Sequence, residues 1–346
     1  MQVQPIRTEP AASCVLCGTQ GKVVYSGLRD RSYAAPGEWS FRRCGNPHCG
    51  TFWLDPAPIP EDVGLAYQGY YTHNQPEPGP SLLRTVVYGT WHAYLGWRFG
   101  YKNGVGPAWA KVFAPLALLH PGGGDELDAA AMHLAAPKGS ARVLDVGCGS
   151  GVLLARMKRL GWEVEGVEVD PGGVEAGRRR GVPVRLGTVA DQEFPEASFD
   201  AVHSAHVIEH VHDPVGLLKE CRRILKPGGK LVFLTPNIES WGHALYKEAW
   251  LNLDPPRHLT LFTPESLRRA AEAAGLHIQR VDTSVRTAWV YAALSECIRR
   301  TGRGEMSELG KASNIARGIG FQLRERVRLR SHPLAGDELR LFATRN

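Results

Sequence analysis

The stretch Val143-Leu-Asp-Val-Gly-Cys-Gly-Ser-Gly151 decides the fold. Its apolar beginning predicts a buried strand over residues 142–146. The glycines that follow let the backbone turn sharply and approach a ligand closely. A helix is expected from Gly151, and the free N–H groups at its first turn suit a carboxylate. The stretch therefore predicts a ligand site at the end of a strand.

The next expected strand, Glu163-Val-Glu-Gly-Val-Glu168, ends in an acidic residue 17 positions after Gly151. A carboxylate at the tip of the second strand can accept both hydroxyls of a ribose. A Gly-x-Gly-x-Gly match alone is also compatible with another nucleotide site or a simple tight turn. The acidic partner at this distance favours a nucleoside-containing ligand.

Strands and helices alternate along the rest of the chain, which predicts a parallel sheet with right-handed crossovers. The expected helices cover 126–135, 151–160, 171–179, 214–225 and 264–274, and the expected strands cover 142–146, 163–168, 182–186, 199–204, 230–235, 277–283 and 338–344. Two inserts, 237–263 and 287–335, interrupt this pattern, and the second is expected to form two helices. These boundaries predict three parts: a module over 1–60, a helical linker or cap over 61–125, and the α/β domain over 126–346.

Several segments together resemble the class I S-adenosylmethionine-dependent methyltransferases. These are the glycine-rich loop with Glu168, then Ser198-Phe-Asp-Ala-Val202, Ile208-Glu-His-Val-His-Asp-Pro214 and Leu225-Lys-Pro-Gly-Gly-Lys-Leu-Val232. The resemblance covers about 137–285 and includes the final strand. It implies an enzyme with a Rossmann-like, seven-stranded α/β sheet, and S-adenosyl-L-methionine as the methyl donor.

The same resemblance implies roles for individual residues in binding the donor. Gly147, Cys148 and Gly149 would line its methionine part, and Asp145 would order the loop and approach the amine. Glu168 would hold the ribose. The remaining expected contacts are Val169 and Val189 at the adenine, Ser204 and Ala205 near the sulfonium, and Tyr71 (or Tyr70) at the donor or substrate. Ordinary packing is the alternative for the tyrosines.

Histidines follow the fourth expected strand, where ligands of open α/β sheets bind. His210 is the first candidate for a general base and His206 the second, with Glu209 beside them. The alternative is that Glu209 and His210 only brace the loop. Some quinone-ring O-methyltransferases of this family bind a divalent cation through Glu-x-x-Glu-His, but His206 here replaces the first Glu, which argues against a metal.

The insert 237–263 carries Asp254-Pro-Pro-Arg-His258-Leu-Thr-Leu-Phe262. This segment resembles one found in methyltransferases grouped with sugar- and small-molecule-modifying enzymes. By that likeness His258 is expected to contact the substrate or act as the base. The alternative is a histidine that anchors a lid.

Four cysteines form two pairs, Cys14-x-x-Cys17-Gly18 and Cys44-x-x-x-x-Cys49-Gly50. Four thiolates on two tight turns predict a closed, structural Zn²⁺ site, and a module this small needs a metal to fold. His48 could replace Cys49, and four unrelated buried cysteines are the alternative. The pattern resembles an N-terminal extension of many sugar, polysaccharide and natural-product methyltransferases, which implies a small β-rich module.

The composition of the chain limits the kinds of partner and the cellular compartment that we expect. The net charge of +6 and the pI of about 9.0 permit an anionic partner. No leader segment or run of 18 apolar residues occurs, so we expect a cytoplasmic protein. The aromatic-rich stretch 81–119 could pack as a bridge, form a dimer face or touch a membrane surface. The sequence does not assign an oligomeric state.

We therefore expect a methyltransferase that modifies a small-molecule acceptor, with a sugar or glycan hydroxyl or a sugar carbon as the target in polysaccharide or natural-product biosynthesis. An rRNA methyltransferase that grips RNA through the zinc module is a second hypothesis, but residues 13–60 hold only four arginines, which argues against nucleic acid. A non-catalytic scaffold that binds the donor is the third.

Overall fold

The computed structural model describes residues 4–67, 82–102 and 122–346. The chain divides into two compact units, each described by itself below. The N-terminal unit holds residues 1–70, 206–219 and 233–343, and the glycine-loop unit holds residues 71–205, 220–232 and 344–346. Helix α6 (Pro214–Ile224) and strand β10 (Leu225–Pro236) contribute residues to both.

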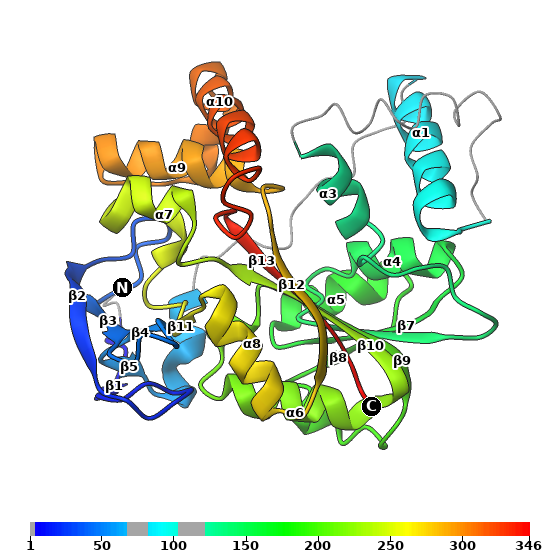
Figure 1. Ribbon diagram of the computed structural model, residues 1–346, viewed down its shortest axis with the longest axis horizontal. Helices are drawn as coiled ribbons and strands as arrows, with labels where there is room; N and C mark the ends of the chain where they lie inside the picture. Colours follow the sequence, from blue (N-terminus) through cyan, green and yellow to red (C-terminus); the bar gives the residue numbers. More distant parts are fainter. Residues whose placement is uncertain (1–3, 68–81, 103–121) are drawn as a thin grey trace. The chain divides into compact units, whose positions relative to one another are not determined.

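The glycine-loop unit alternates strands and helices (Figure 1). Its elements are α1 (Leu82–Phe99), α3 (Gly123–Ala129), β6 (Arg142–Val146), α4 (Val152–Arg159), β7 (Glu163–Glu168), α5 (Pro171–Arg179), β8 (Val184–Leu186), η3 (Ala190–Gln192) and β9 (Phe199–Ala205). Strand β6 pairs in parallel with both β7 and β9, and β7 pairs in parallel with β8. The predicted parallel arrangement is confirmed for these strands.

Local sequence signals set these boundaries. Helix α5 begins after Asp170, whose side chain accepts a hydrogen bond from the Gly172 N–H at 2.9 Å, with Pro171 at the first helical position. The expected helix over 126–135 ends earlier, because Met132 and His133 have φ of +53° and +54°.

The N-terminal unit contains an antiparallel four-stranded sheet in the order β11-β4-β3-β2. Its strands are β2 (Gly21–Leu28), β3 (Trp39–Cys44), β4 (Phe52–Leu54) and β11 (Thr260–Leu261). The edge strand β11 comes from the predicted insert 237–263. The N-terminal sheet therefore does not close at residue 60, where the sequence places the module boundary, because a strand from far along the chain completes it.

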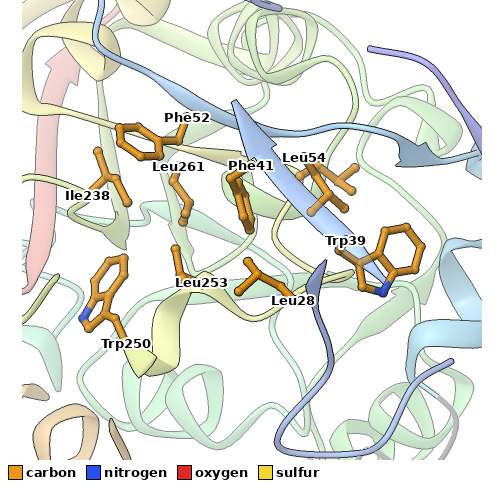
Figure 2. Close-up of a cluster of buried hydrophobic side chains, with 10 residues drawn as sticks. Leu28, Trp39, Phe41, Phe52, Leu54, Ile238, Trp250, Leu253 and Leu261 are labelled. Carbon is orange, nitrogen blue, oxygen red and sulfur yellow. The ribbon is translucent and has the colours of Figure 1, made fainter. Parts of the chain in front are cut away.

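A hydrophobic cluster joins this sheet to the insert (Figure 2). Its members are all buried: Leu28, Trp39, Phe41, Phe52, Leu54, Ile238, Trp250, Leu253, Leu259 and Leu261. In Figure 2 the side chain of Leu261 lies beside that of Phe41. The cluster is the shared core of two regions that are separate in sequence.

Shorter elements complete the early part of this unit. A two-stranded pairing joins β1 (Thr8–Glu9) to β5 (Ala57–Pro58). At the start of the predicted helical linker or cap over 61–125, the structure has a 3-10 helix, η1 (Pro60–Tyr67). The segment before β11 contains η4 (Ile208–His210), α7 (Trp241–Tyr246), η5 (Lys247–Ala249) and η6 (Leu251–Leu253).

The later part of the N-terminal unit consists of α8 (Pro264–Ala273), β12 (His277–Ser284), α9 (Ala288–Thr301), η7 (Met306–Gly310), α10 (Ala312–Arg328) and β13 (Glu338–Thr344). Helices α9 and α10 pack against each other, which confirms the two helices expected in the second insert (Figure 1).

Seven strands form one sheet in the order β12-β13-β10-β9-β6-β7-β8. This confirms the predicted α/β fold with a seven-stranded sheet. Within the described residues, no helix has the length and apolar character needed to cross a membrane.

Because the insert contributes to the shared core, a substitution in the insert should lower the free energy of unfolding. Leu261→Ala removes a fully buried side chain, so we expect the free energy of unfolding to fall by about 2–5 kcal/mol in urea denaturation. Leu245→Ala, at a side chain that is half exposed, should change it by no more than about 0.5 kcal/mol. Equal losses in the two variants would contradict the assignment of this core.

Candidate functional site

The glycine-rich loop is fastened to the neighbouring strand β7. The N–H groups of Gly147 and Cys148 both donate to the carbonyl oxygen of Val167, at 2.8 and 3.1 Å. Gly147, Gly149 and Gly151 have φ of +73°, +52° and +72°, which side-chain-bearing residues rarely adopt. The loop conformation therefore depends on glycine at these positions.

Glu168 closes the loop from the other side. Its Oε2 accepts from the Gly149 N–H at 2.7 Å, and its Oε1 accepts from the Asp170 N–H at 3.0 Å. A carboxylate oxygen has two lone pairs, so each oxygen can accept a further hydrogen bond. The predicted ribose-binding carboxylate is thus held in place at the end of β7, beside the predicted methionine-binding loop.

Asp145 is held by a histidine that the sequence analysis did not select. The Nδ1 atom of His203 lies 2.7 Å from Asp145 Oδ1, and both side chains are buried. The two residues are register partners on β6 and β9. His203 could have been selected from the sequence because it is a polar residue within the apolar strand Phe199–Ala205. His203 fixes one oxygen of the carboxylate that was expected to order the loop.

The other residues predicted to bind the donor differ in exposure. Val169 is 66% exposed and presents a free apolar surface beside Glu168, whereas Val189 is 2% exposed and offers little surface to an adenine. Ser204 is buried and donates its hydroxyl to the Val146 carbonyl at 3.0 Å, and Ala205 ends β9. Tyr70 and Tyr71 lie outside the described residues.

In the N-terminal unit, His206 lies between two buried carboxylates. Its Nδ1 lies 3.2 Å from Glu209 Oε1, and its Nε2 lies 3.1 Å from Glu338 Oε1. Burial opposes its charge, but Tyr291 and the carboxylates of Glu209 and Glu338 raise the pKa of His206 well above 6.5. With a proton on each nitrogen, this ring has no lone pair left to accept one.

Glu209 serves as a buried brace. Its Oε2 accepts the Thr235 hydroxyl at 2.9 Å, and its carbonyl accepts the Leu259 N–H at 2.7 Å. Burial opposes ionisation, yet the hydrogen bond from His206 and the nearby histidines lower the pKa of Glu209 to about 2. The carboxylate is therefore negatively charged around neutral pH.

His210 is held in one tautomer. Its Nδ1 lies 2.9 Å from the Arg257 carbonyl oxygen and 3.0 Å from the Tyr67 hydroxyl. Because a carbonyl oxygen only accepts, Nδ1 carries the proton and Nε2 keeps its lone pair. Burial, followed by the nearby His258, lowers the pKa of His210 to about 4. The ring is thus neutral at physiological pH.

His258 repeats this arrangement beside His210. Its Nδ1 lies 2.7 Å from the Asn252 carbonyl oxygen, so its Nε2 also keeps a lone pair. The two ring centroids are 4.7 Å apart. The structure therefore brings together His210 and His258, which the sequence placed 48 residues apart.

Two groups of residues have the spacing of metal ligands. One ligand atom from each of Glu209, His210 and His258 lies within 4.8 Å of the others. The other group is the predicted set of four cysteines, Cys14, Cys17, Cys44 and Cys49, whose sulfurs also lie within 4.8 Å of one another. His48, the alternative ligand to Cys49, is not part of this group.

The cysteine group fits a tetrahedral ion. The Sγ atoms of Cys14 and Cys49 are 3.7 Å apart, and those of Cys17 and Cys44 are 3.4 Å apart. Four sulfurs at about 2.3 Å from a central zinc would lie about 3.8 Å from each other. The hydrogen bond between Cys14 and Cys49 lowers the pKa of Cys49 and raises the pKa of Cys14, so Cys49 is the thiolate of this pair.

Comparisons with known proteins agree with this geometry. A family model described as a methyltransferase domain matches residues 124–281. The ubiquinone biosynthesis O-methyltransferase of Xanthomonas axonopodis pv. citri is 35% identical over 162 residues, which are 43% of this chain and 68% of that protein. The chain belongs to the class I S-adenosylmethionine-dependent methyltransferases.

Other relatives in this methyltransferase family match over shorter parts. Proteins of the same name from Idiomarina loihiensis and Xanthomonas oryzae pv. oryzae are 34% and 43% identical, over 39% and 28% of this chain. The chain spans 61% and 44% of their respective lengths. A solved structure described as a possible histamine N-methyltransferase from Thermotoga maritima aligns with a TM-score of 0.44 at 20% identity, covering 74% of this chain and all of that one.

The loop geometry makes a prediction at Gly166 of β7. A Cβ there would lie 2.5 Å from Cys148 Sγ and 2.7 Å from Leu154 Cδ1, so in Gly166→Ala the side chains of Cys148 in the loop and of Leu154 must shift. We expect S-adenosylhomocysteine to bind about tenfold more weakly in calorimetry, a loss of ~1.4 kcal/mol.

Gly320→Ala on α10 is the matched control, because a Cβ there meets open space. Its affinity for S-adenosylhomocysteine should equal that of the wild type. Unchanged affinity in Gly166→Ala would show that the clamped loop does not bind the donor.

Proposed function

We propose that this protein transfers a methyl group from S-adenosyl-L-methionine to a hydroxyl group of a small molecule. The observation that carries the proposal is the glycine-rich loop fastened to Glu168 through the Gly149 N–H at 2.7 Å. That geometry fixes a carboxylate, which keeps lone pairs for ribose hydroxyls, beside a sharp glycine turn that a ligand can approach closely.

Each predicted donor contact has a place in this proposal. Gly147, Cys148 and Gly149 line the methionine part, Glu168 accepts the ribose hydroxyls, and the exposed Val169 covers the adenine. Asp145, oriented by His203, approaches the amine. The end of β9 at Ser204 and Ala205 approaches the sulfonium, and Val189 contributes through its backbone because its side chain is buried. Tyr71 remains a prediction.

His210 is the proposed general base. A methyl transfer to a hydroxyl forms the new C–O bond while the acceptor loses a proton, so a neutral group with an available lone pair must stand near the acceptor. His210 Nε2 has such a lone pair, and the Arg257 carbonyl and Tyr67 hold the ring. His258 is the next candidate by the same geometry, whereas His206 and Glu209 act as charged braces.

The low basicity of His210 indicates which kind of acceptor hydroxyl it can deprotonate. A base whose pKa is about 4 removes a proton most readily from an acidic hydroxyl, such as that of a phenol or an enol. The names of the relatives, O-methyltransferases of ubiquinone biosynthesis, support oxygen as the target atom. A sugar hydroxyl, the acceptor expected from the N-terminal cysteine module, remains a prediction to be compared in the same assay.

A second candidate mechanism uses a divalent cation. Glu209, His210 and His258 present ligand atoms within 4.8 Å of one another, and both histidines donate their other N–H to a backbone carbonyl, as metal-bound histidines do. A cation there would lower the pKa of an acceptor hydroxyl that bound to it.

The four-cysteine group is proposed to hold a structural Zn²⁺. The group has no open position for a substrate when all four thiolates bind, which indicates a role in folding. Trp53 packs against the cysteines, and the Asn46 N–H lies 3.4 Å from Cys44 Sγ. A zinc ion would stabilise the turns that precede β2 and β4.

The role of His210 is testable by kinetics. His210→Ala should lower kcat by about 10²–10⁴-fold while the affinity for S-adenosylhomocysteine stays within about twofold. The neutral ring is the reactive form, so kcat/KM should fall only as pH drops toward about 4 and should show no transition near 6.5. Methyl transfer to a catechol and to a nucleotide sugar is the measurement.

His212→Ala, two residues away, is the control and should keep its turnover. Unchanged kcat in His210→Ala would exclude the base assignment. Loss of wild-type activity on dialysis against EDTA, with recovery on adding Mn²⁺, would instead assign His210 the role of a metal ligand.

Zinc content tests the cysteine group. Wild-type protein should carry one zinc per chain by elemental analysis, and Cys44→Ser should lose most of it and unfold at a lower temperature. Cys297→Ser, outside the group, should retain its zinc. A zinc-free wild type that unfolds at the same temperature with or without added zinc would refute the structural metal.

A further inference from the structure

We propose that a cavity between α1 and α4 is a second ligand site, which binds a phosphate or diphosphate group. The cavity has a volume of about 240 Å³ and is lined by Trp91, His92, Arg156, Arg159 and Leu160. This volume is below the roughly 300–1,000 Å³ of sites that enclose drug-sized molecules, so it suits a compact charged group. The whole site belongs to the glycine-loop unit.

Among the described residues that line the cavity, the charged side chains are two arginines. Arg156 and Arg159 are three residues apart on α4 and therefore share a face of the helix. Arg159 forms no ion pair with any residue in the described part of the chain. Two like charges on one helix face destabilise each other, and an anion bound between them would relieve the repulsion.

The pKa of His92 on α1 responds to the same two arginines. Burial lowers its pKa, and the charges of Arg159 and Arg156 lower it further. Among the described residues, the lining includes no carboxylate. A neutral imidazole can still donate one hydrogen bond to a phosphate oxygen, while both guanidinium groups supply charge.

Trp91 makes part of this site rigid. The guanidinium of Arg156 lies over its indole at 5.0 Å from the ring centroid, and the His92 ring lies 4.7 Å away at a tilt of 59°. The indole is buried. Stacking on a fixed aromatic ring reduces the conformational freedom that Arg156 would lose on binding a ligand.

Basic residues in the last turn of a helix have a common alternative role, because they stabilise the helix dipole. In helix α5, Arg179 in the last turn pairs with Glu175 of the same helix at 3.4 Å. The arginines of α4 instead border a cavity with a histidine and a tryptophan from another helix, which the dipole alone does not require.

The cavity is separate from the proposed donor site. Its α4 residues follow Gly151 by five to nine positions, so at 1.5 Å per residue they lie roughly 8–14 Å further along the helix axis. The donor loop stands at the N-terminal end of α4, and the cavity borders its C-terminal half. A phosphate bound here therefore belongs to a different molecule or to a distant part of the acceptor.

Inorganic pyrophosphate is the first probe, titrated calorimetrically into full-length protein that is saturated with S-adenosylhomocysteine. One pyrophosphate should bind per chain, with an affinity that falls as salt rises. Arg159→Gln and Arg156→Gln should each weaken binding by about tenfold or more. Arg178→Gln, an equally basic position in the last turn of α5, should bind like the wild type.

Vesicles distinguish the source of the phosphate. Co-sedimentation with phosphatidic acid vesicles that is lost in Arg159→Gln would identify a lipid headgroup as the ligand. Pyrophosphate binding without sedimentation would identify a soluble phosphate ester. Both results support the site.

No binding of either probe by wild-type protein, or equal weakening in Arg178→Gln, would overturn the proposal. S-adenosylhomocysteine affinity should be unchanged in Arg159→Gln, which also shows that the variant is folded. Failure of the donor to bind any variant would refute the methyltransferase proposal and leave the pyrophosphate result standing.

Discussion

The buried guanidinium of Arg257 is the interaction on which the N-terminal unit depends. It pairs with Asp30 at 2.8 and 2.9 Å and with Asp254 at 2.8 Å, and it donates to the Ala66 carbonyl at 3.0 Å. A charge with no solvent exposure persists in a folded protein only when such partners replace water. The three partners come from the loop after β2, from η1 and from the insert. One side chain therefore fixes three segments that are remote in sequence.

The same residue sets the chemistry of the histidines. While the Arg257 side chain holds the segments together, its backbone carbonyl accepts a hydrogen bond from the Nδ1–H of His210. The ring is then neutral and presents Nε2. His206, only four residues earlier, has the opposite state because carboxylates face both of its nitrogens. The two histidines of this short segment therefore differ in charge. The partners of His206 are carboxylates, which favour its charged form, whereas the partner of His210 is a neutral carbonyl.

The sequence was most informative where the signals are local. The glycine-rich loop, Glu168 and α5 could be predicted to within a residue, because glycine conformations, strand patterns and an Asp-Pro start act over a few positions. Partners set by distant segments could not be predicted: His203 under Asp145, Tyr67 at His210, and Asp30 at Arg257. A two-residue strand such as β11 is also too short to show a periodic pattern. Only pairing with β4 gives it that structure.

The position of β11 has a consequence for how the chain acquires its structure. Strand β4 pairs with β3 on one side, but its neighbour on the other side, β11, lies roughly 200 residues further along the chain. During synthesis from the N-terminus, the apolar face around Trp39 and Phe41 stays uncovered until the insert has left the ribosome. Pairing over such a separation also slows folding. The cysteine pairs lie in the turns beside β2, β3 and β4, so an early-bound metal would hold these strands in order while their missing neighbour is still being made.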